Sequence, residues 1–154
     1  MTLTITGLLA ARREALVAAA RTAMGTAYAP YSGFSVGAAL LAEDGAMFSG
    51  CNVENASYGL TICAERAAIV RAAAEGKRRF RAIAIVSAGN PPAAPCGACR
   101  QALAEFAEDM EILLGGPDGS ERERLSLAEL LPRRFGPEAL EKTKDGQKSD
   151  SSDG

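Results

Sequence analysis

The stretch FRAIAIVSAGNPPAAPCGACRQALAEF, residues 80–106, contains three successive structural signals. Its apolar first part, with Ala-Ile-Ala-Ile-Val at the centre, predicts a buried strand over residues 80–87. Glycine and prolines then predict a loop, and the following segment predicts a helix over residues 96–108. Cys96 and Cys99 stand three positions apart at the start of that helix, so both thiols can bind one ion.

Further elements on both sides of this stretch predict an α/β protein. Residues 63–75 are rich in alanine and precede Gly76, the usual residue after a helix. Asp44-Gly45 favours a tight turn between two strands. The other predicted elements are helices at 8–24 and 127–131 and strands at 36–42, 47–53, 111–114 and 121–125. This order predicts a three-layer sandwich in which helices flank both faces of a mixed five-stranded sheet.

Length and charge limit the domain count and the partners. A chain of 154 residues is expected to form one domain, here residues 1–137. Residues 138–154 are polar and free of aromatic side chains, which predicts a disordered tail. A net charge of -2 gives no electrostatic argument for a nucleic-acid partner. The one basic run, residues 77–81, is interpreted as a solvated loop.

No targeting or membrane signal is recognisable. No stretch approaches the ~20 apolar residues that a membrane span needs, so no membrane partner is expected. Residues 1–11 are followed by Arg12-Arg13, an order that does not fit a secretory signal peptide. We therefore expect a cytoplasmic protein whose four cysteines are thiols or metal ligands, not disulfides.

Three cysteines and one glutamate form the pattern of a catalytic zinc site. Cys63 and Glu65 begin one predicted helix, and Cys96 and Cys99 begin another. The chain has no histidine, so a zinc ion must rely on sulfur or carboxylate ligands. Structural zinc is normally closed by four protein ligands, whereas catalytic zinc keeps one position open. Three thiols with a glutamate that need not bind the metal favour the open arrangement.

The spacing of these residues predicts where they lie on their helices. Residues two apart point to opposite sides of a helix, so Cys63 and Glu65 can share a site only where Cys63 lies at the very start. Thr61 is expected to cap that helix. We expect two helix amino termini to converge on the metal, because their free amides stabilise thiolates. Arg66 and Arg100 are candidates for hydrogen bonds to sulfur.

Cys51, the fourth cysteine, allows two interpretations. It stands in a predicted strand without a partner at ligand spacing, and we interpret it as a small buried core residue. The alternative is a fourth metal ligand. The protein would then be a structural-zinc interaction module with no use for Glu65.

At this point the chain resembles a known family. Cys63-Ala64-Glu65-Arg66, together with Pro95-Cys96-Gly97-Ala98-Cys99-Arg100-Gln101, is similar to cytidine deaminases of the small, homotetrameric, three-cysteine zinc type. The resemblance runs from about residue 11 to residue 137. Its other segments are residues 27–40, 50–59 and 130–137.

The resemblance implies roles for individual residues. It implies one Zn²⁺ per subunit, held by Cys63, Cys96 and Cys99, with Glu65 as the proton shuttle. The implied substrate contacts are ribose hydrogen bonds from Asn52 and Glu54, packing of Phe34 on the pyrimidine, the backbone of Ala64 at the base edge, and Ala56 and Tyr58 reaching a neighbouring subunit's site.

Elementary geometry supports these substrate contacts unequally. Asn52 and Glu54 alternate along a strand end and therefore face the same side. Without the resemblance, Phe34 would be interpreted as a core aromatic residue.

The function implied is zinc-dependent hydrolytic deamination of cytidine and deoxycytidine to uridine and deoxyuridine plus ammonia, in pyrimidine salvage. Two other deaminase classes share the metal motif. A deaminase of the antibiotic blasticidin S is less favoured because residues 52–55 and 130–137 match the cytidine enzymes better. A polynucleotide deaminase is less favoured because the chain lacks an extended basic face.

Overall fold

The computed structural model describes residues 5–141, with side chains from residue 10 onward. The helices are α1 (Ile5–Met24), the 3₁₀ turn η1 (Tyr58–Leu60), α2 (Ala64–Ala74), α3 (Gly97–Ala104) and α4 (Leu127–Leu130). The strands are β1 (Val36–Ala42), β2 (Met47–Cys51), β3 (Phe80–Ser87), β4 (Glu111–Gly115) and β5 (Glu121–Ser126).

The strands form one mixed five-stranded sheet in the order β2-β1-β3-β4-β5. β1 pairs antiparallel with β2 and β3, β3 pairs parallel with β4, and β4 pairs antiparallel with β5. The parallel pair is joined by α3, because parallel neighbours need a crossover connection. The predicted mixed sheet is therefore confirmed.

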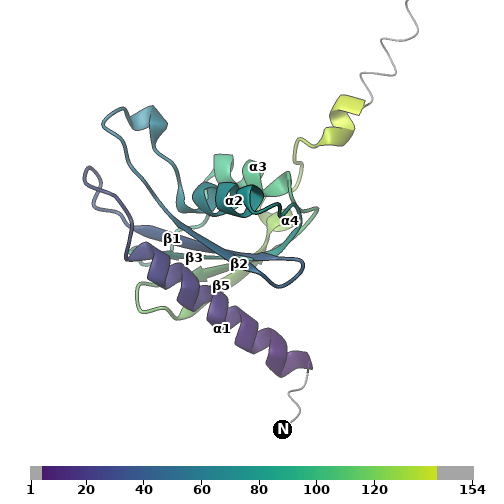
Figure 1. The fold of residues 1–154 in the computed structure, drawn as a ribbon, viewed down its shortest axis with the longest axis horizontal. Coiled ribbons are helices and arrows are strands. Elements are labelled where there is room, and N and C mark those ends of the chain that lie inside the picture. Colours follow the sequence, from purple (N-terminus) through teal and green to yellow (C-terminus); the bar gives the residue numbers. More distant parts are fainter. Residues whose placement is uncertain (1–4, 142–154) are drawn as a thin grey trace, which may run out of the picture.

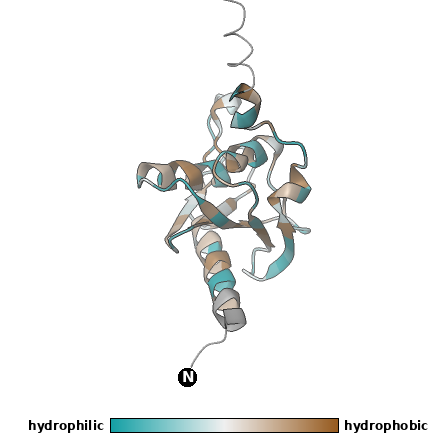
Figure 2. Cartoon of the chain, turned by 90° about the vertical axis from the view of Figure 1, so that its right-hand side faces the viewer, coloured by the Kyte–Doolittle hydropathy of each residue, from teal (hydrophilic) through white to brown (hydrophobic). Residues whose placement is uncertain are grey.

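Helices cover both faces of the sheet (Figure 1), which confirms the predicted three-layer sandwich. α1 packs on one face, where Leu16, Val17 and Ala20 are buried. α2 and α3 lie on the other face. Side chains alternate along each strand, so in β1 Ala39 belongs to the α1 layer and Leu40 to the α2–α3 layer. Apolar and polar turns alternate along α1 (Figure 2), as expected of a helix with one buried face.

Two glycines allow the helices to approach the sheet closely. A Cβ atom on Gly37 in β1 would collide with the backbone of α1 at Ala20 and Met24. A Cβ atom on Gly50 in β2 would lie 2.5 Å from the backbone nitrogen of Ala68 in α2. The second contact matters for the site, because it sets the height of α2 above the sheet.

Two elements end at least two residues earlier than predicted. α3 ends at Ala104 and not at residue 108, and the Arg134 guanidinium donates hydrogen bonds to the carbonyls of Ala104 (3.2 Å) and Ala107 (2.7 Å). A contact from a distant segment thus takes over carbonyls that a longer helix would have used. β2 ends at Cys51, and Val53 instead forms isolated bridges to Tyr28 and Ile62.

The carboxyl-terminal part of the described chain contains one more helical turn, at residues 137–141. Most of the predicted tail, residues 142–154, lies outside the described residues. The division into a domain of residues 1–137 and a disordered tail therefore stays a prediction. Among the helices of residues 5–141, none is long and apolar enough to cross a membrane.

Candidate metal centre and active site

The two predicted helix starts converge, each with a cysteine in the capping position. Cys63 precedes α2 with φ -71° and ψ 153°, and Cys96 precedes α3 with φ -66° and ψ 166°. Both residues are extended, so their side chains leave the helix direction. Glu65 lies in the first turn of α2. This resolves the spacing problem, because Cys63 is not part of the regular helix.

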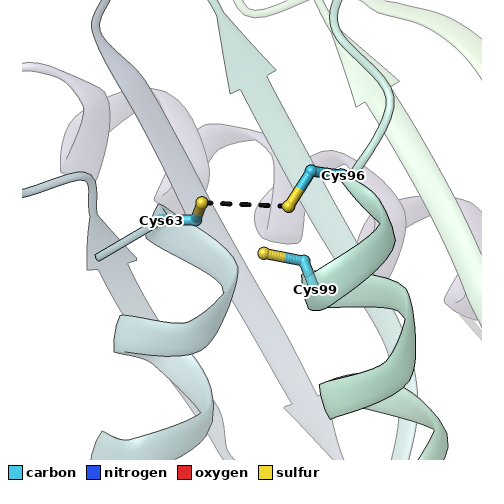
Figure 3. A group of neighbouring side chains, drawn as sticks. All are labelled: Cys63, Cys96 and Cys99. Carbon is cyan, nitrogen blue, oxygen red and sulfur yellow. Dashed lines mark hydrogen bonds between the residues drawn. The ribbon is translucent and has the colours of Figure 1, made fainter. Parts of the chain in front are cut away.

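The three sulfur atoms of Cys63, Cys96 and Cys99 gather between these helix starts (Figure 3). All three lie within 4.8 Å of one another, and the Sγ atoms of Cys63 and Cys96 are 4.0 Å apart. Cys99 is fully buried, whereas Cys96 is exposed. The group holds no carboxylate among the described residues, so Glu65 is not part of the ligand set.

The donor set fits zinc. Sulfur atoms around a tetrahedral zinc with Zn–S bonds of about 2.3 Å lie roughly 3.8 Å apart, close to the observed spacing. Burial raises the pKa of the thiols of Cys63 and Cys99. Burial also opposes ionisation of Cys96, but hydrogen bonds from the backbone and thiol of Cys99 and from the Cys63 thiol lower its pKa. Without metal the cluster therefore holds protons that zinc displaces on binding.

Glu65 is a buried carboxyl group beside the thiols. Only 5% of the residue is exposed. Burial raises the pKa of Glu65, and this shift is partly offset by hydrogen bonds from its own backbone and from the Cys99 thiol and by the charge of Arg66. A carboxyl group with a raised pKa can both accept and donate a proton near neutral pH.

Arg66 supplies positive charge next to the sulfurs. The Cys63 side chain raises the pKa of Arg66, with a smaller contribution from Cys99. Its Nη2 donates to the carbonyl oxygen of Thr61 at 3.2 Å. Its Nε is buried and has no hydrogen-bond partner within the described residues. An unpaired buried donor costs free energy, and a thiolate that carries negative charge in the metal-bound form is a suitable acceptor.

Two predictions about the surroundings of the metal centre are wrong. Thr61 does not cap α2, because Cys63 occupies the capping position and only the Thr61 carbonyl is engaged. The hydrogen bonds of the Arg100 side chain reach the carbonyls of Pro95 and Leu130 and not sulfur. Both errors arise because side chains can bind main-chain carbonyls of residues that no sequence spacing identifies.

Cys51 does not complete the metal centre. It is absent from the sulfur cluster of the described residues, and its thiol donates to the carbonyl of Thr26 at 3.5 Å. This excludes the closed four-cysteine site of a structural-zinc module. Cys51 is only half-buried, so it is also not the deeply buried core residue expected.

Asn52 lies at the end of β2 and holds the segment that carries Phe34. Its amide nitrogen donates to the carbonyl of Phe34 at 2.8 Å, and its amide oxygen accepts from the backbone N–H of Val36 at 2.9 Å. Phe34 is not a core residue, since 40% of it is exposed. Its ring lies 3.5 Å from the position of a Cβ atom on Gly89, in the loop that leads to Cys96.

Glu54 holds the same loop two residues further along. Its carboxylate accepts from the backbone N–H groups of Tyr31 (2.8 Å) and Ser32 (3.2 Å) and from the Ser32 hydroxyl. The Ser32 hydroxyl group is the main cause that lowers the pKa of Glu54, which therefore stays ionised at neutral pH.

A pocket of about 260 Å³ opens between the loop before β1 and the loop that joins β2 to α2. Its lining residues are Tyr31, Ser32, Glu54, Tyr58 and Thr61. The rings of Tyr31 and Tyr58 meet at 5.7 Å between centroids, and Tyr58 is 74% exposed on η1. This turn projects beyond the sheet on the same side as the loop before β1 (Figure 1).

The remaining predicted contacts are main-chain or small residues. Ala64 is fully buried and is the first residue of α2, where backbone N–H groups lack partners within the helix. Ala56 is exposed just before η1. The sequence interpretation gave no role to Tyr31 and Ser32, although both lie in the family-like segment of residues 27–40. That segment, with their position before Phe34, was the available signal.

The α/β sandwich and its three-thiol centre define a zinc-dependent enzyme. Residues 10–114 match the family model of the cytidine and deoxycytidylate deaminase zinc-binding region. The chain belongs to this family.

Individual relatives of this chain carry names from the same family. The chain is 48% identical to a cytidine deaminase of Sporosarcina psychrophila over 128 residues, which is 82% of this chain and 93% of the relative. It is 49% identical to one of Halalkalibacterium halodurans over 129 residues, which is 83% of this chain and 97% of the relative.

Solved structures give the same result for the fold. The crystal structure of cytidine deaminase from Burkholderia pseudomallei has a TM-score of 0.74 and 52% identity, covering 79% of this chain and 97% of that one. That of Mycobacterium tuberculosis has a TM-score of 0.68 and 43% identity, covering 80% and 97%.

Proposed function

We propose that this protein hydrolyses cytidine and deoxycytidine to uridine and deoxyuridine with release of ammonia. The observation that carries the proposal is the buried carboxyl group of Glu65 in the first turn of α2, next to the thiols that hold the metal. Zinc in such a site activates a water molecule for nucleophilic attack. The carboxyl group of Glu65 can then take a proton from this water and pass it on, because burial raises its pKa.

Glu65 acts as base and acid in turn. It accepts a proton from the attacking water and delivers it to ring N3 of the pyrimidine, which makes C4 electrophilic. After the water oxygen has bonded to C4, Glu65 takes the remaining proton from this hydroxyl group and delivers it to the exocyclic amino group. The C4–N bond breaks, ammonia leaves, and water has replaced the amino group with no change in oxidation state.

The nucleoside is proposed to bind across the two loops beside the metal centre. Asn52 and Glu54 face the ribose hydroxyls, and Phe34 packs on the base. Support comes from the shared placement of these residues, because Asn52 and Glu54 both hold the loop that carries Phe34. The backbone N–H at Ala64 is proposed to contact the base edge, since it lies at the buried start of α2.

Ala56 and Tyr58 are proposed to reach a neighbouring subunit's site in a homotetramer. The exposed aromatic turn η1 supports this, because Tyr58 stays 74% exposed even though its ring contacts that of Tyr31. Sedimentation of the purified protein tests the assembly. A monomer at assay concentration with full activity would contradict it.

A cytoplasmic role in pyrimidine salvage completes the proposal. The relatives named above support the reaction but carry no information on location. Growth of a cytidine-dependent host that lacks its own deaminase, with and without this gene, tests the salvage role.

The decisive experiment follows the fall in ultraviolet absorbance when cytidine or deoxycytidine is converted. Wild-type protein should convert both nucleosides, lose activity with a zinc chelator and regain it with Zn²⁺. Glu65→Gln is the matched control, because it keeps the thiols and removes the proton carrier. Conversion of blasticidin S with a higher kcat/KM than cytidine, or no conversion of either nucleoside, would overturn the proposal.

A further inference from the structure

Arg100 hydrogen-bonds to both peptide groups that flank Cys96. The Nε of Arg100 donates to the carbonyl oxygen of Pro95 at 2.7 Å. The backbone N–H of Arg100 donates to the carbonyl oxygen of Cys96 at 3.0 Å. The Cα atom of Cys96 lies between these two peptide planes. Their orientation sets φ and ψ of Cys96, and with them the direction in which its sulfur points.

Cys96 needs such support more than the other cysteine of α3. Cys99 is fully buried, so packing holds its side chain in place. Cys96 is exposed and sits in the capping position, outside the regular helix. Pro95 is fully buried and has a fixed φ, so the chain reaches Cys96 in a rigid state. The remaining freedom is rotation of the peptide plane between Pro95 and Cys96, whose carbonyl Arg100 holds.

The Arg100 guanidinium has a second anchor. Its Nη1 donates to the carbonyl oxygen of Leu130 at 2.9 Å, at the end of α4. The guanidinium therefore bridges the segment before Cys96 and the carboxyl-terminal part of the fold. A planar fork with several donors suits two carbonyls at once, which a lysine cannot match.

The ligand on α2 is supported differently. Arg66 donates to the carbonyl of Thr61, two residues before Cys63, and not to the peptide group next to it. Cys63 is also half-buried, whereas Cys96 is exposed. The two peptide groups that flank Cys63 are held by main-chain donors, because the N–H of Val53 donates to the Ile62 carbonyl and the N–H of Ala67 to the Cys63 carbonyl, each at 3.0 Å. At Cys96 the preceding carbonyl is held by a side chain instead, that of Arg100.

We propose that Arg100 is a positioning residue of the metal centre, whose side chain fixes the sulfur of Cys96 by holding the carbonyl of the peptide group before it, while the backbone N–H at this position makes the ordinary helical bond to the Cys96 carbonyl. Arg100 acts on the metal only through Cys96. The inference rests on the thiol centre and not on the identity of the substrate, so its failure would leave the deamination proposal untouched.

Zinc retention tests this proposal without any substrate. Zinc-loaded Arg100→Gln protein is mixed with an excess of a chromogenic chelator, and the rate of zinc transfer is recorded. Loss of a group that orients a metal ligand typically weakens metal affinity about 10- to 100-fold. We expect a change of this size, together with an altered thiolate-to-metal absorption band in the Co²⁺-substituted protein.

Arg134→Gln is the matched control. Arg134 is also half-buried and donates to the carbonyl of Ala104, the last residue of the same helix, and to that of Ala107 just after it, at the end away from the metal. We expect it to release zinc at the wild-type rate. If both variants released zinc equally fast, the effect would be a general loosening of α3 and the proposal would fall.

Arg100→Lys covers the case in which the glutamine variant does not fold. Lysine keeps the positive charge and can reach one carbonyl, but not both. A folded lysine variant that releases zinc faster than Arg134→Gln supports the positioning role. Release at the wild-type rate, with an unchanged Co²⁺ spectrum, would overturn it.

Discussion

The metal centre and the loops proposed to bind the nucleoside, which lie before β1 and between β2 and α2, are built in opposite ways. At the metal centre, Cys99 is 0% and Glu65 5% exposed, and helix starts packed on the sheet hold them. In the loops, Tyr31 is 50% and Tyr58 74% exposed, and the loop before β1 is held by hydrogen bonds to the side chains of Asn52 and Glu54, just after β2. The first region is thus complete within one chain, and the second is open.

This difference separates two properties. Metal binding depends on the packing of one chain and should survive changes in the loops. Nucleoside binding depends on exposed loops and on whatever covers them, so it should be lost without loss of zinc. Each prediction below changes one region and measures both properties.

The largest effect is expected for Cys99→Ala, which changes the buried metal centre. It removes one of three sulfur ligands and leaves the other two thiols without a third partner. We expect loss of bound zinc, measured by elemental analysis, and with it loss of all detectable deamination. Full zinc occupancy in this variant would refute the ligand role of Cys99. The matched control is Cys51→Ala, which lies outside the cluster and should keep its zinc.

Glu65→Gln is expected to separate metal from chemistry within the buried region. The amide has nearly the same shape as the carboxyl group but cannot carry the proton. General acid–base catalysis typically contributes ~10²–10⁴-fold, and we expect a fall in kcat of at least this size with zinc content unchanged. A variant with wild-type kcat would remove Glu65 from the mechanism.

Asn52→Ala changes the open region instead. It removes the partners of the exposed Phe34 carbonyl and of the partly buried Val36 N–H. A typical hydrogen bond contributes about 0.5–1.5 kcal/mol, so the two together contribute about 1–3 kcal/mol. Because every 1.4 kcal/mol is tenfold in an equilibrium constant, we expect kcat/KM for cytidine to fall about 10- to 100-fold at unchanged zinc content. Asn52→Asp keeps the acceptor for Val36 and should lose less. Loss of zinc in either variant would contradict the separation of the two regions.

The same contrast explains how much the sequence could predict. The strands, the helix starts and the Cys96–Cys99 pair follow from local patterns, because apolar runs and cysteine spacing act over a few residues. Cys63 stands 33 positions before Cys96 and was joined to the pair because it begins a second predicted helix. The Arg100 and Arg134 contacts could not be predicted, since these side chains bind carbonyls about 30 positions away. The predicted end of α3, at residue 108, was wrong for this reason. Likewise, nothing in the local pattern indicates that Glu54 binds the loop at Ser32, because a charged side chain can equally face solvent.

The smallest expected effect is a change in thermal stability with pH. It compares Glu65 at the metal centre with Glu54 in the loops, whose pKa values shift in opposite directions. In zinc-free protein, burial raises the pKa of Glu65, so the folded state binds more protons than the unfolded state above the ordinary pKa of about 4.3. Stability is therefore lost as pH rises through that window.

Glu54 has the opposite sign. The Ser32 hydroxyl lowers its pKa, so the stability it contributes is present above the ordinary pKa and is lost as pH falls. Glu65→Gln should therefore raise the Tm of zinc-free protein near about pH 7, whereas Glu54→Gln should lower it. The Glu65 difference should shrink towards about pH 4, where this carboxyl group becomes neutral in either state, whereas the Glu54 difference should shrink only at lower pH, because its pKa in the folded state lies below the ordinary value.

Thermal unfolding of the two variants and the wild type across this range, each in excess chelator, measures the contrast. If both variants shifted Tm in the same direction at neutral pH, the prediction would be wrong. Burial at the metal centre and hydrogen bonding in the loop would then not give the two carboxyl groups opposite pKa shifts.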